Sequence, residues 1–303
     1  MNVLITGGAG FIGSHLIRYL NKQGNSITIF DNFSNSSNAI ISGYDIKLIE
    51  GDILDYSLLS KSLKNIDIVI HLAAQISVID SIKNPQHTMK INVIGTQNVL
   101  DACLENNVKN FIAISSAAIF GNQDTLLTEN SNPEPISPYG QSKLLMEKRI
   151  IDFSKKHLLN SIILRFFNLY GSGQSSQYAG VITKFLENIR ENKPLEIYGT
   201  GNQTRDFIHI DDAIECIHLA IKHINKNTAK IYNVGSGKST SILDLANLLS
   251  KLSGRNLPIN FKPDTKGTIL YSKTSIALAK KELGFEPKIS LQAGLSKFFQ
   301  SYS

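Results

Sequence analysis

The sequence predicts an α/β fold in which a doubly wound parallel sheet is followed by a smaller C-terminal α/β lobe. Short, continuously apolar runs alternate with amphipathic helical patterns, which is typical of parallel strands covered by helices on both faces. A glycine-rich loop directly follows the first apolar run. After Gly171 the pattern loosens into shorter strands and helices, and 303 residues suffice for a large core with a second lobe.

Six apolar runs are predicted as strands of the main sheet, and three stretches with apolar residues three and four apart are predicted as helices. We expect residues 1–170 to form the first domain and residues 171–303 to form mainly the second lobe. Because Phe207–Ala220 again has a strand-then-helix pattern, parts of 199–235 are expected to return to the first domain. The strands are Val3–Ile5, Ile27–Phe30, Ile46–Ile49, Ile68–His71, Phe111–Ile114 and Ser161–Phe166; the helices are Phe11–Leu20, Met89–Leu104 and Ser142–Ile151.

Composition and charge exclude several classes of protein. The net charge is +6, but the basic residues are spread along the chain, whereas a nucleic-acid footprint needs clusters. We therefore expect no nucleic-acid partner. The sequence has no signal-peptide pattern and no apolar stretch of membrane-spanning length, so no membrane association is expected. Two cysteines, Cys103 and Cys216, make no disulfide framework, which favours the cytoplasm.

Two further kinds of site are excluded. The seven histidines show neither an HExxH pattern nor a Cys/His cluster, so no metal site is predicted. The stretch Gly235–Thr240 resembles a phosphate-binding P-loop, but Tyr232 and Asn233 stand where the first glycine of that pattern belongs. We instead expect Thr240 or Ser241 to cap a helix.

The glycine loop TGGAGFIG places Gly7, Gly10 and Gly13 between the first strand and the first helix. Glycines there permit a tight turn and a close approach of the backbone to a pyrophosphate, and the helix N-terminus offers free N–H groups. A plain strand–helix turn is the alternative interpretation. The position of the loop between strand and helix favours a dinucleotide site in a Rossmann-type domain.

Two acidic residues end the second and third strands. Asp31 can accept the hydroxyl groups of an adenosine ribose and would repel a 2′-phosphate, and residues 32–38 contain no Lys or Arg to bind one. NAD is therefore favoured over NADP, with a turn-forming Asp31-Asn32 pair as the alternative. Asp52 can reach the adenine, although a plain turn explains it equally well.

Tyr139 and Lys143 are four residues apart and so share one face of a predicted helix. A phenol ionises near pH ~10, and a nearby ammonium would lower that pKa. Ser116 follows the strand Phe111–Ile114 and adds a hydroxyl at the edge of the sheet. A solvated helix surface can show the same Tyr/Lys spacing by chance, but Ser116 and the glycine loop favour a proton-transfer site.

These motifs resemble the extended short-chain dehydrogenase/reductase family, and most closely its nucleotide-sugar 4-epimerase branch. The similarity extends over nearly the whole chain through HLAAQISV (71–78), INVIGTQN (91–98), RFFNLYG (165–171), GTGNQTRDFIHIDD (199–212) and NVGSGKSTSI (233–242). Dehydrating and decarboxylating relatives carry an acid at the position of Ala118, and often at that of Ala117. Two alanines leave oxidation and reduction at one carbinol carbon as the implied chemistry.

The resemblance implies an NAD-dependent epimerase of UDP-glucose and UDP-galactose, or of the N-acetylhexosamine pair, with a transient 4-keto sugar. Tyr139 would take the O4 proton, Ser116 would hydrogen-bond O4, and Lys143 would bind the nicotinamide ribose. The implied cofactor contacts are Gly7, Gly10, Phe11, Ile12, Gly13, Asp31, Asn32, Asp52, Ile53, Leu72, Ala73, Ala74, Asn92, Tyr139, Lys143 and Phe166. The implied substrate contacts are Ser77, Ser116, Asn168, Gly180, Val181, Tyr198, Arg205 and Ser272.

The chain departs from the family pattern in the second lobe. Thr265 and Thr268 stand where relatives carry an arginine and an aspartate, and Lys262 or Lys266 is the candidate replacement for the arginine. Ser272 is small, which in the family leaves room for a 2-N-acetyl group. The alternatives are a nucleotide-4-keto-sugar reductase or dehydrogenase, and a non-catalytic binder, which an intact Ser116, Tyr139 and Lys143 argue against. The family often forms homodimers through two helices, here Met89–Leu104 and Ser142–Ile151.

Overall fold

A computed structural model of the chain describes residues 1–36, 41–174, 180–224, 228–264 and 269–302. Its centre is a seven-stranded sheet in which every neighbouring pair of strands is parallel, with the order β10-β6-β5-β4-β1-β2-β3. This confirms the predicted fold class, and the six predicted strands are all present. The strands are β1 (Asn2–Thr6), β2 (Ser26–Asp31), β3 (Lys47–Glu50), β4 (Ile68–His71), β5 (Asn110–Ser116), β6 (Asn160–Phe166) and β10 (Ala229–Val234).

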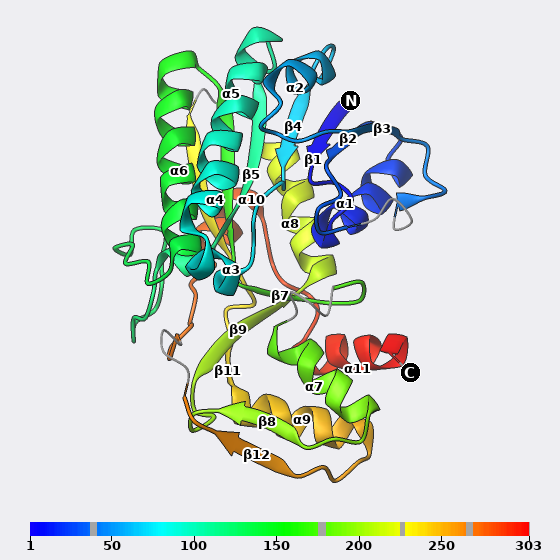
Figure 1. The fold of residues 1–303 in the computed structure, drawn as a ribbon, viewed down its shortest axis with the longest axis vertical. Helices are drawn as coiled ribbons and strands as arrows, with labels where there is room; N and C mark the ends of the chain where they lie inside the picture. Colours follow the sequence, from blue (N-terminus) through cyan, green and yellow to red (C-terminus); the bar gives the residue numbers. More distant parts are fainter. Residues whose placement is uncertain (37–40, 175–179, 225–227, 265–268, 303) are drawn as a thin grey trace.

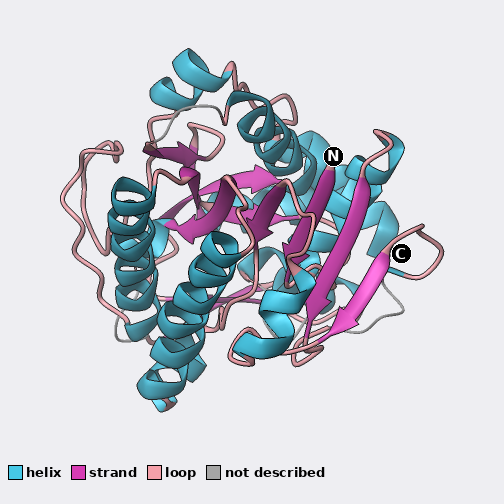
Figure 2. Cartoon of the chain, turned by 90° about the horizontal axis from the view of Figure 1, so that it is seen from above, coloured by secondary structure: helices cyan, strands magenta, loops and turns pink. Residues whose placement is uncertain are grey.

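Helices cover both faces of this sheet (Figures 1 and 2). One apolar core lies between the sheet and α1, α8 and α10, and the other lies between the sheet and α2, α5 and α6. The strands are therefore buried on both sides, which explains their continuous apolar runs. The helices are α1 (Phe11–Lys22), α2 (Tyr56–Ser62), α3 (Val78–Lys83), α4 (Pro85–Met89), α5 (Thr96–Glu105), α6 (Pro138–His157), α8 (Ile210–His223) and α10 (Ala277–Leu283), with the short 3-10 turn η3 (Ala117–Ile119).

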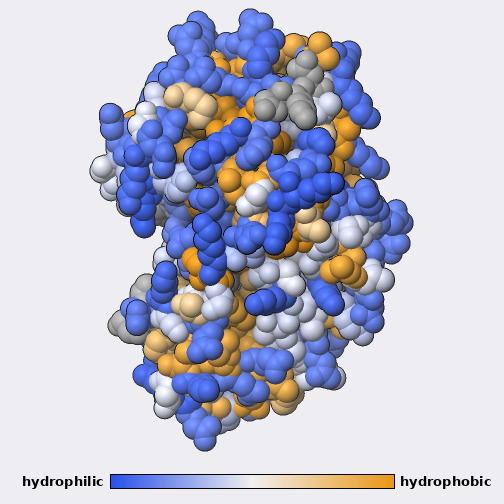
Figure 3. Space-filling view, turned by 180° about the vertical axis from the view of Figure 1, so that it is seen from behind, coloured by the Kyte–Doolittle hydropathy of each residue, from blue (hydrophilic) through white to orange (hydrophobic). Residues whose placement is uncertain are grey.

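The second lobe has its own apolar core, built around small sheets rather than a large one. It lies below the main sheet in Figure 1, and Figure 3 shows the surface narrowing between the two parts. One sheet has the order β11-β9-β7 and the other pairs β12 with β8. The elements are β7 (Asn168–Tyr170), α7 (Val181–Arg190), β8 (Leu195–Tyr198), β9 (Thr204–His209), β11 (Ser239–Ser241), α9 (Ile242–Ser253), β12 (Ile259–Lys262) and α11 (Leu291–Tyr302).

The chain crosses between the lobes more than once. The segment predicted to return to the first domain contributes α8 to the cover of the main sheet and β10 to its edge, beside β6. Its strand β9 pairs instead with β7 and β11. Ser241 caps α9 by accepting a hydrogen bond from the backbone N–H of Asp244, which confirms the second of the two predicted caps.

The predicted helix Met89–Leu104 is interrupted. Residues Lys90–Gly95 form a π-helix, η2, between α4 and α5. Gly95 lies against Ile53, whose side chain would collide with a Cβ at this position. Thr96 Oγ1 also accepts a hydrogen bond from His71 Nε2 on β4, at 2.8 Å, while it donates to the Asn92 carbonyl oxygen one turn back, at 2.7 Å. The wider turn thus depends on contacts with other segments, which periodicity alone cannot show; π-helical turns often occur at functional sites.

Candidate active site

A cavity of about 670 Å³ lies at the carboxyl ends of the central strands. In parallel α/β sheets ligands bind at this edge, where the order of the strands reverses between β1 and β4. The glycine loop, the ends of β2, β4 and β5, and the first turn of α6 all contribute to its wall. The cavity therefore brings together motifs that lie more than a hundred residues apart in the sequence.

The glycine loop requires glycine on steric grounds at two positions. Gly7 has a φ of +67°, and a Cβ there would lie 2.6 Å from the backbone nitrogen of Ala73. A Cβ on Gly13 would collide with the carbonyl oxygen of Gly8. Helix α1 then begins at Phe11 without a side-chain cap, so its first N–H groups remain available to a phosphate. Gly7, Gly10, Phe11, Ile12 and Gly13, which the sequence predicts as cofactor contacts, all line the cavity.

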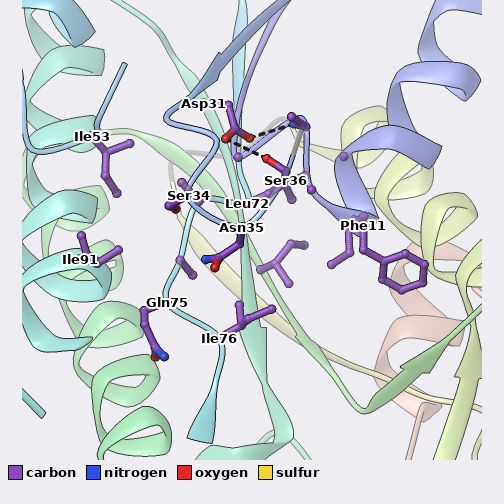
Figure 4. Close-up of a pocket in the computed structure, with 18 of the residues that line it drawn as sticks. Phe11, Asp31, Ser34, Asn35, Ser36, Ile53, Leu72, Gln75, Ile76 and Ile91 are labelled. Carbon is purple, nitrogen blue, oxygen red and sulfur yellow. Dashed lines mark hydrogen bonds between the residues drawn. The ribbon is translucent and has the colours of Figure 1, made fainter. Parts of the chain in front are cut away.

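Asp31 is buried at the end of β2 and is held by the backbone on both sides. Its Oδ2 accepts from Ala9 N at 2.9 Å, and its Oδ1 accepts from Phe33 N at 2.8 Å and from Ser36 Oγ at 3.3 Å (Figure 4). The carboxylate is thus fixed in place before any ribose arrives. The long bond to the Ser36 hydroxyl is the one that a ribose hydroxyl can most readily replace.

The sequence prediction missed the cavity contacts of the loop that follows Asp31. Ser34, Asn35 and Ser36 line the cavity, and Figure 4 shows Asn35 lying near Ile76 across it. The polar composition of the loop was the only signal. After β3, Asp52 Oδ2 accepts from Asn32 Nδ2 at 3.0 Å, and both residues line the cavity together with Ile53.

The predicted catalytic residues Ser116, Tyr139 and Lys143 meet at the other end of the same cavity. Ser116 ends β5, and its Oγ accepts from Ala118 N at 3.2 Å. Tyr139 lies in the first turn of α6, which Ser137 caps. Lys143 is buried one turn further on, and its Nζ donates to the Ile114 carbonyl oxygen at 2.8 Å.

Burial changes the ionisation of Tyr139 and Lys143. We expected Lys143 to lower the pKa of Tyr139, whereas burial raises the pKa of the Tyr139 phenol and the Ser116 side chain opposes only part of this rise. The Lys143 ammonium is directed to Ile114. Burial also lowers the pKa of Lys143 to about 8, against the opposing effect of Glu147. Burial thus favours the neutral form of both side chains.

His71 joins the glycine loop strand to helix α5. Thr96 Oγ1 already donates to Asn92, so it accepts from His71 Nε2, at 2.8 Å. His71 Nδ1 then accepts from Thr6 Oγ1 at 2.7 Å. Burial lowers the pKa of His71 to about 3, with a further contribution from Lys143. The ring is therefore neutral and supports the carboxyl edge of the sheet without taking up a proton.

The loop after β4 reaches the cavity. Leu72, Ala73 and Ala74 line it, and so does Phe166 at the end of β6. Asn92 does not: it is fully buried behind the wall. Its carboxamide accepts from Gln75 N at 2.8 Å and donates to Gln75 O at 2.9 Å, so its direct contact is with the protein. Gln75, which we did not predict, lines the cavity instead.

The predicted substrate residues are dispersed, and Ser116 alone of them lines the cavity. Ser77 caps α3 by accepting from Asp80 N, and Asn168 Nδ2 donates to Asp206 O. Arg205 Nη1 donates to the carbonyl oxygens of Thr204 and Ile269, at 2.8 and 2.7 Å. Gly180 and Val181 begin α7, Tyr198 ends β8 at the surface, and Ser272 is buried beside Thr204.

The lost family motif cannot be placed, because Thr265, Lys266 and Thr268 lie outside the described residues. Lys262, the other candidate replacement for the arginine, forms a surface ion pair with Glu196 at 3.4 Å. Within the described ranges, no group of three or more His, Cys, Asp or Glu side chains is arranged to hold a metal ion. In the same ranges, no helix has the length and apolarity needed to cross a membrane.

The residues of the cavity fit a dinucleotide. The loop leaves backbone N–H groups for a pyrophosphate, Asp31 presents a carboxylate to a ribose, and Ser116, Tyr139 and Lys143 stand at the far end. The wall as described carries no arginine, and its one lysine, Lys143, lies at the catalytic end, away from Asp31. This agrees with a ribose that bears no 2′-phosphate.

Comparisons with known proteins support a dinucleotide-binding site in this cavity. Residues 3–235 match the NAD dependent epimerase/dehydratase family. The UDP-glucose 4-epimerase of Halalkalibacterium halodurans is 32% identical over 306 residues, covering 95% of this chain and 91% of the relative. The structure of UDP-glucose 4-epimerase from Thermotoga maritima with UDP-glucose has a TM-score of 0.95 and 33% identity, covering 100% of this chain and 98% of that one.

A third similar protein has been crystallised with a nucleotide sugar and NAD together. The UDP-glucuronic acid 4-epimerase of Bacillus cereus, in complex with UDP-glucuronic acid and NAD, has a TM-score of 0.93 and 32% identity, covering 100% of this chain and 99% of that chain. The similarity thus spans both lobes as well as the motifs of the cavity. The chain therefore belongs to the NAD-dependent epimerase/dehydratase family, within the extended short-chain dehydrogenases/reductases, where nucleotide-sugar 4-epimerases are its structural neighbours.

Proposed function

We propose that this chain is an NAD-dependent UDP-sugar 4-epimerase, acting on UDP-glucose and UDP-galactose or on the corresponding N-acetylhexosamine pair. The observation that carries the proposal is that Ser116, Tyr139 and Lys143 line the same cavity as the glycine loop and Asp31. Ala117 and Ala118 follow Ser116, so this edge lacks the carboxyl group with which dehydrating relatives move protons at carbon. The similar proteins include epimerases of UDP-glucose and of UDP-glucuronic acid.

Tyr139 and Ser116 handle the proton of the sugar O4 hydroxyl. When bound, NAD⁺ supplies the acceptor for the hydride at C4 and returns it to the 4-keto sugar. Tyr139, as the phenolate, takes the O4 proton and later gives it back, while Ser116 hydrogen-bonds O4 and holds it near the phenol. The 4-keto sugar turns over between the two transfers and so presents its opposite face. Because the cofactor is regenerated in each turnover, it can stay bound.

Lys143 and the buried wall set the charge at this end of the cavity. Burial raises the pKa of the Tyr139 phenol, and the positive charges of Lys143 and of a bound nicotinamide ring would oppose that rise and favour the phenolate. Lys143 adds a positive charge one turn away on the same helix, and its hydrogen bond to Ile114 fixes the side chain at the cavity wall. In its family role Lys143 would bind the nicotinamide ribose with the ammonium donors that the Ile114 carbonyl oxygen does not use.

The choice of sugar depends on the second lobe. Ser272 is small and buried next to Thr204, which supports tolerance of a 2-N-acetyl group. Arg205, which we assign to the diphosphate, has one nitrogen engaged by two backbone carbonyls, and its planar guanidinium keeps other N–H groups for phosphate oxygens. Asn168, Gly180, Val181 and Tyr198 complete the proposed nucleotide contacts.

We extend the proposal to assembly and location. A homodimer would pair through α4–α5 and α6, which lie side by side on one face of the sheet (Figure 1), and Ile94 and Leu104 are exposed on the first of these segments. The free cysteines Cys103 and Cys216 are both buried, which supports a reducing compartment such as the cytoplasm. We assign residues 1–170, with α8 and β10 from the returning part of 199–235, to the cofactor domain, and residues 171–303 otherwise mainly to the substrate lobe.

The deciding experiment incubates the purified protein, without added cofactor, with UDP-galactose or UDP-N-acetylgalactosamine. Products are separated by chromatography while the absorbance of NADH is followed. Conversion to the 4-epimer without net NADH supports the epimerase and shows which 2-substituent fits. Conversion that needs a stoichiometric supply of nicotinamide cofactor would instead establish a net oxidoreductase. Unchanged substrate under both conditions would favour a binder.

A further inference from the structure

The start of helix α6 leaves one backbone donor of the catalytic tyrosine without a partner in its own helix. The first N–H groups of any α-helix lack intrahelical acceptors. Ser137 Oγ caps Gly140 N at 3.1 Å, and Pro138 has no N–H to satisfy. The remaining donor in this turn is the Tyr139 N–H, and its acceptor is Ser81 Oγ on helix α3, at 3.1 Å.

Ser81 is oriented by a second hydrogen bond. Its side chain is fully buried, and Ser81 Oγ donates to the Val78 carbonyl oxygen at 2.6 Å. The single hydroxyl proton is therefore committed to Val78, which turns a lone pair toward Tyr139. The bond between the two helices thus has a defined direction, from the Tyr139 N–H to the Ser81 hydroxyl.

The other side of Tyr139 is held in a similar way. Ser142 Oγ donates to the Tyr139 carbonyl oxygen at 2.7 Å and accepts from Asn92 Nδ2 at 2.9 Å. Asn92 in turn clamps Gln75, as described above. The two peptide groups that flank the Tyr139 α-carbon are therefore tied to α3 on one side and to the π-helix η2 on the other.

Helix α3 also belongs to the wall of the cavity. Asp80 lines the cavity one residue before Ser81, and Ile76 lines it just before Ser77, the α3 cap. The same short helix therefore contacts whatever fills the cavity and holds the backbone of the catalytic tyrosine. Small displacements of a catalytic group change rates strongly, since a shift of about 1 Å can lower a rate roughly a hundredfold.

We propose that Ser81 is a positioning residue for Tyr139. Its hydroxyl holds the tyrosine backbone against helix α3, which forms part of the cavity wall. This inference rests on the proposed epimerase function, because Tyr139 is assigned its role there. Ser81 itself touches neither the sugar nor the cofactor. Removing its hydroxyl loosens the first turn of α6, so the phenol samples positions from which the O4 proton is out of reach.

The test compares Ser81→Ala with Ser62→Ala in the NAD-loaded protein. Ser62 is a matched control, because its Oγ donates to the Leu59 carbonyl oxygen at 2.6 Å, as Ser81 does to Val78, and it lies outside the cavity wall in α2. We expect Ser81→Ala to lower kcat per bound NAD roughly tenfold, with KM for the UDP sugar changed less than about twofold. Ser62→Ala should leave both constants near those of the parent.

A second readout does not depend on turnover. Hydrogen exchange resolved to single amides should show the Tyr139 N–H exchanging at least roughly tenfold faster in Ser81→Ala, since a lost acceptor opens that amide to water. The Gly140 N–H, which Ser137 holds, should stay protected in the same sample. Ser81→Cys keeps the shape of the side chain but is a weak acceptor, and should give both effects in smaller measure.

The outcomes separate the two proposals. If the parent protein converts no UDP sugar, the proposed function is wrong, whereas the exchange of the Tyr139 amide still reports on the Ser81 contact. If the parent is active and Ser81→Ala matches Ser62→Ala in kcat per bound NAD, the positioning role is overturned. Unchanged protection of the Tyr139 amide would overturn it as well. Should Ser81→Ala fail to fold, Ser81→Cys gives the same decision through both readouts.

Discussion

The cofactor end of the site is built from short consecutive segments at the ends of neighbouring strands, whereas the residues assigned to the sugar nucleotide are scattered over the second lobe. The glycine loop, Asp31 and Asp52 meet in one cavity because parallel strands bring their carboxyl ends to one edge. Arg205 and Ser272 reach their places through small sheets and long connections. The first arrangement is a local property of the sequence, and the second depends on how the lobes pack.

The catalytic residues lie between the two regions and act on the substrate itself, so we expect a substitution there to lower activity most. Tyr139→Phe removes the phenol oxygen that takes the O4 proton and leaves the ring in place. We expect 4-epimerisation to fall roughly a thousandfold, in the range of general acid–base contributions. NAD affinity, measured by fluorescence or calorimetry, should stay within about threefold of the parent, because the glycine loop and Asp31 are intact. Residual activity near the parent level would remove Tyr139 from the mechanism.

The next prediction tests whether the glycine loop at the cofactor end requires glycine on steric grounds. Gly13→Ala places a Cβ against the Gly8 carbonyl oxygen, so the loop must shift. We expect the free energy of unfolding to fall by about 1–3 kcal/mol, with weaker NAD binding. Gly180→Ala is the matched control in the second lobe, since its φ is −70° and a Cβ there meets nothing within 4 Å. Equal losses in both variants would contradict the contrast between the regions.

The buried charge of Lys143 makes the free energy of unfolding depend on pH, which an exposed lysine of the second lobe should not do. Lys143 has a folded pKa of about 8, against 10.5 for an ordinary lysine. Between these values the unfolded chain binds more protons, so the contribution of Lys143 to the free energy of unfolding rises with pH, by at most about 1.4 kcal/mol per pH unit. Below about pH 8 both states hold the proton, and the burial of the charged group weakens the fold by a constant amount.

Denaturant unfolding of the parent and of Lys143→Met between about pH 8 and about pH 10 measures this term, and the variant should lack the rise. Lys262→Met is the control in the second lobe, since it removes an exposed lysine paired with Glu196 at the surface. It should retain the slope of the parent. The same slope in all three proteins would show that the Lys143 charge is better solvated than its surroundings indicate.

The sequence predicted the parts of the molecule that depend on neighbours along the chain. Gly7, Gly13 and Asp31 were recognised because a strand, a tight turn and a helix follow one another within a few residues. The π-helix at Lys90–Gly95 was not foreseen, because it depends on Gly95 meeting Ile53 and on the hydrogen bond of Thr96 with His71. Spacing on a helix also does not show that burial raises the pKa of Tyr139, or that Lys143 donates to the Ile114 carbonyl oxygen.

Contacts that cross between segments were missed for the same physical reason. Gln75 occupies the wall position, with Asn92 behind it, because two hydrogen bonds join their backbone and carboxamide groups. Ser77 and Ser81 look alike in sequence, yet one caps its own helix and the other accepts a hydrogen bond from the first turn of α6. The packing of α3 on α6 decides which helix each hydroxyl hydrogen-bonds. The periodicity of the sequence does not show this packing.

The smallest expected effect lies in the second lobe, at Ser272. Its buried side chain is assigned to the space beside the 2-substituent, so Ser272→Tyr should lower kcat/KM for UDP-N-acetylglucosamine roughly fivefold relative to UDP-glucose, within the range that steric changes in a pocket produce. The ratio of the two constants is measured on one preparation, so partial misfolding cancels. Ser272→Ala stays small and should keep the parent ratio. If Ser272→Tyr also keeps the parent ratio, the 2-substituent lies away from residue 272, and the second lobe contacts only the nucleotide.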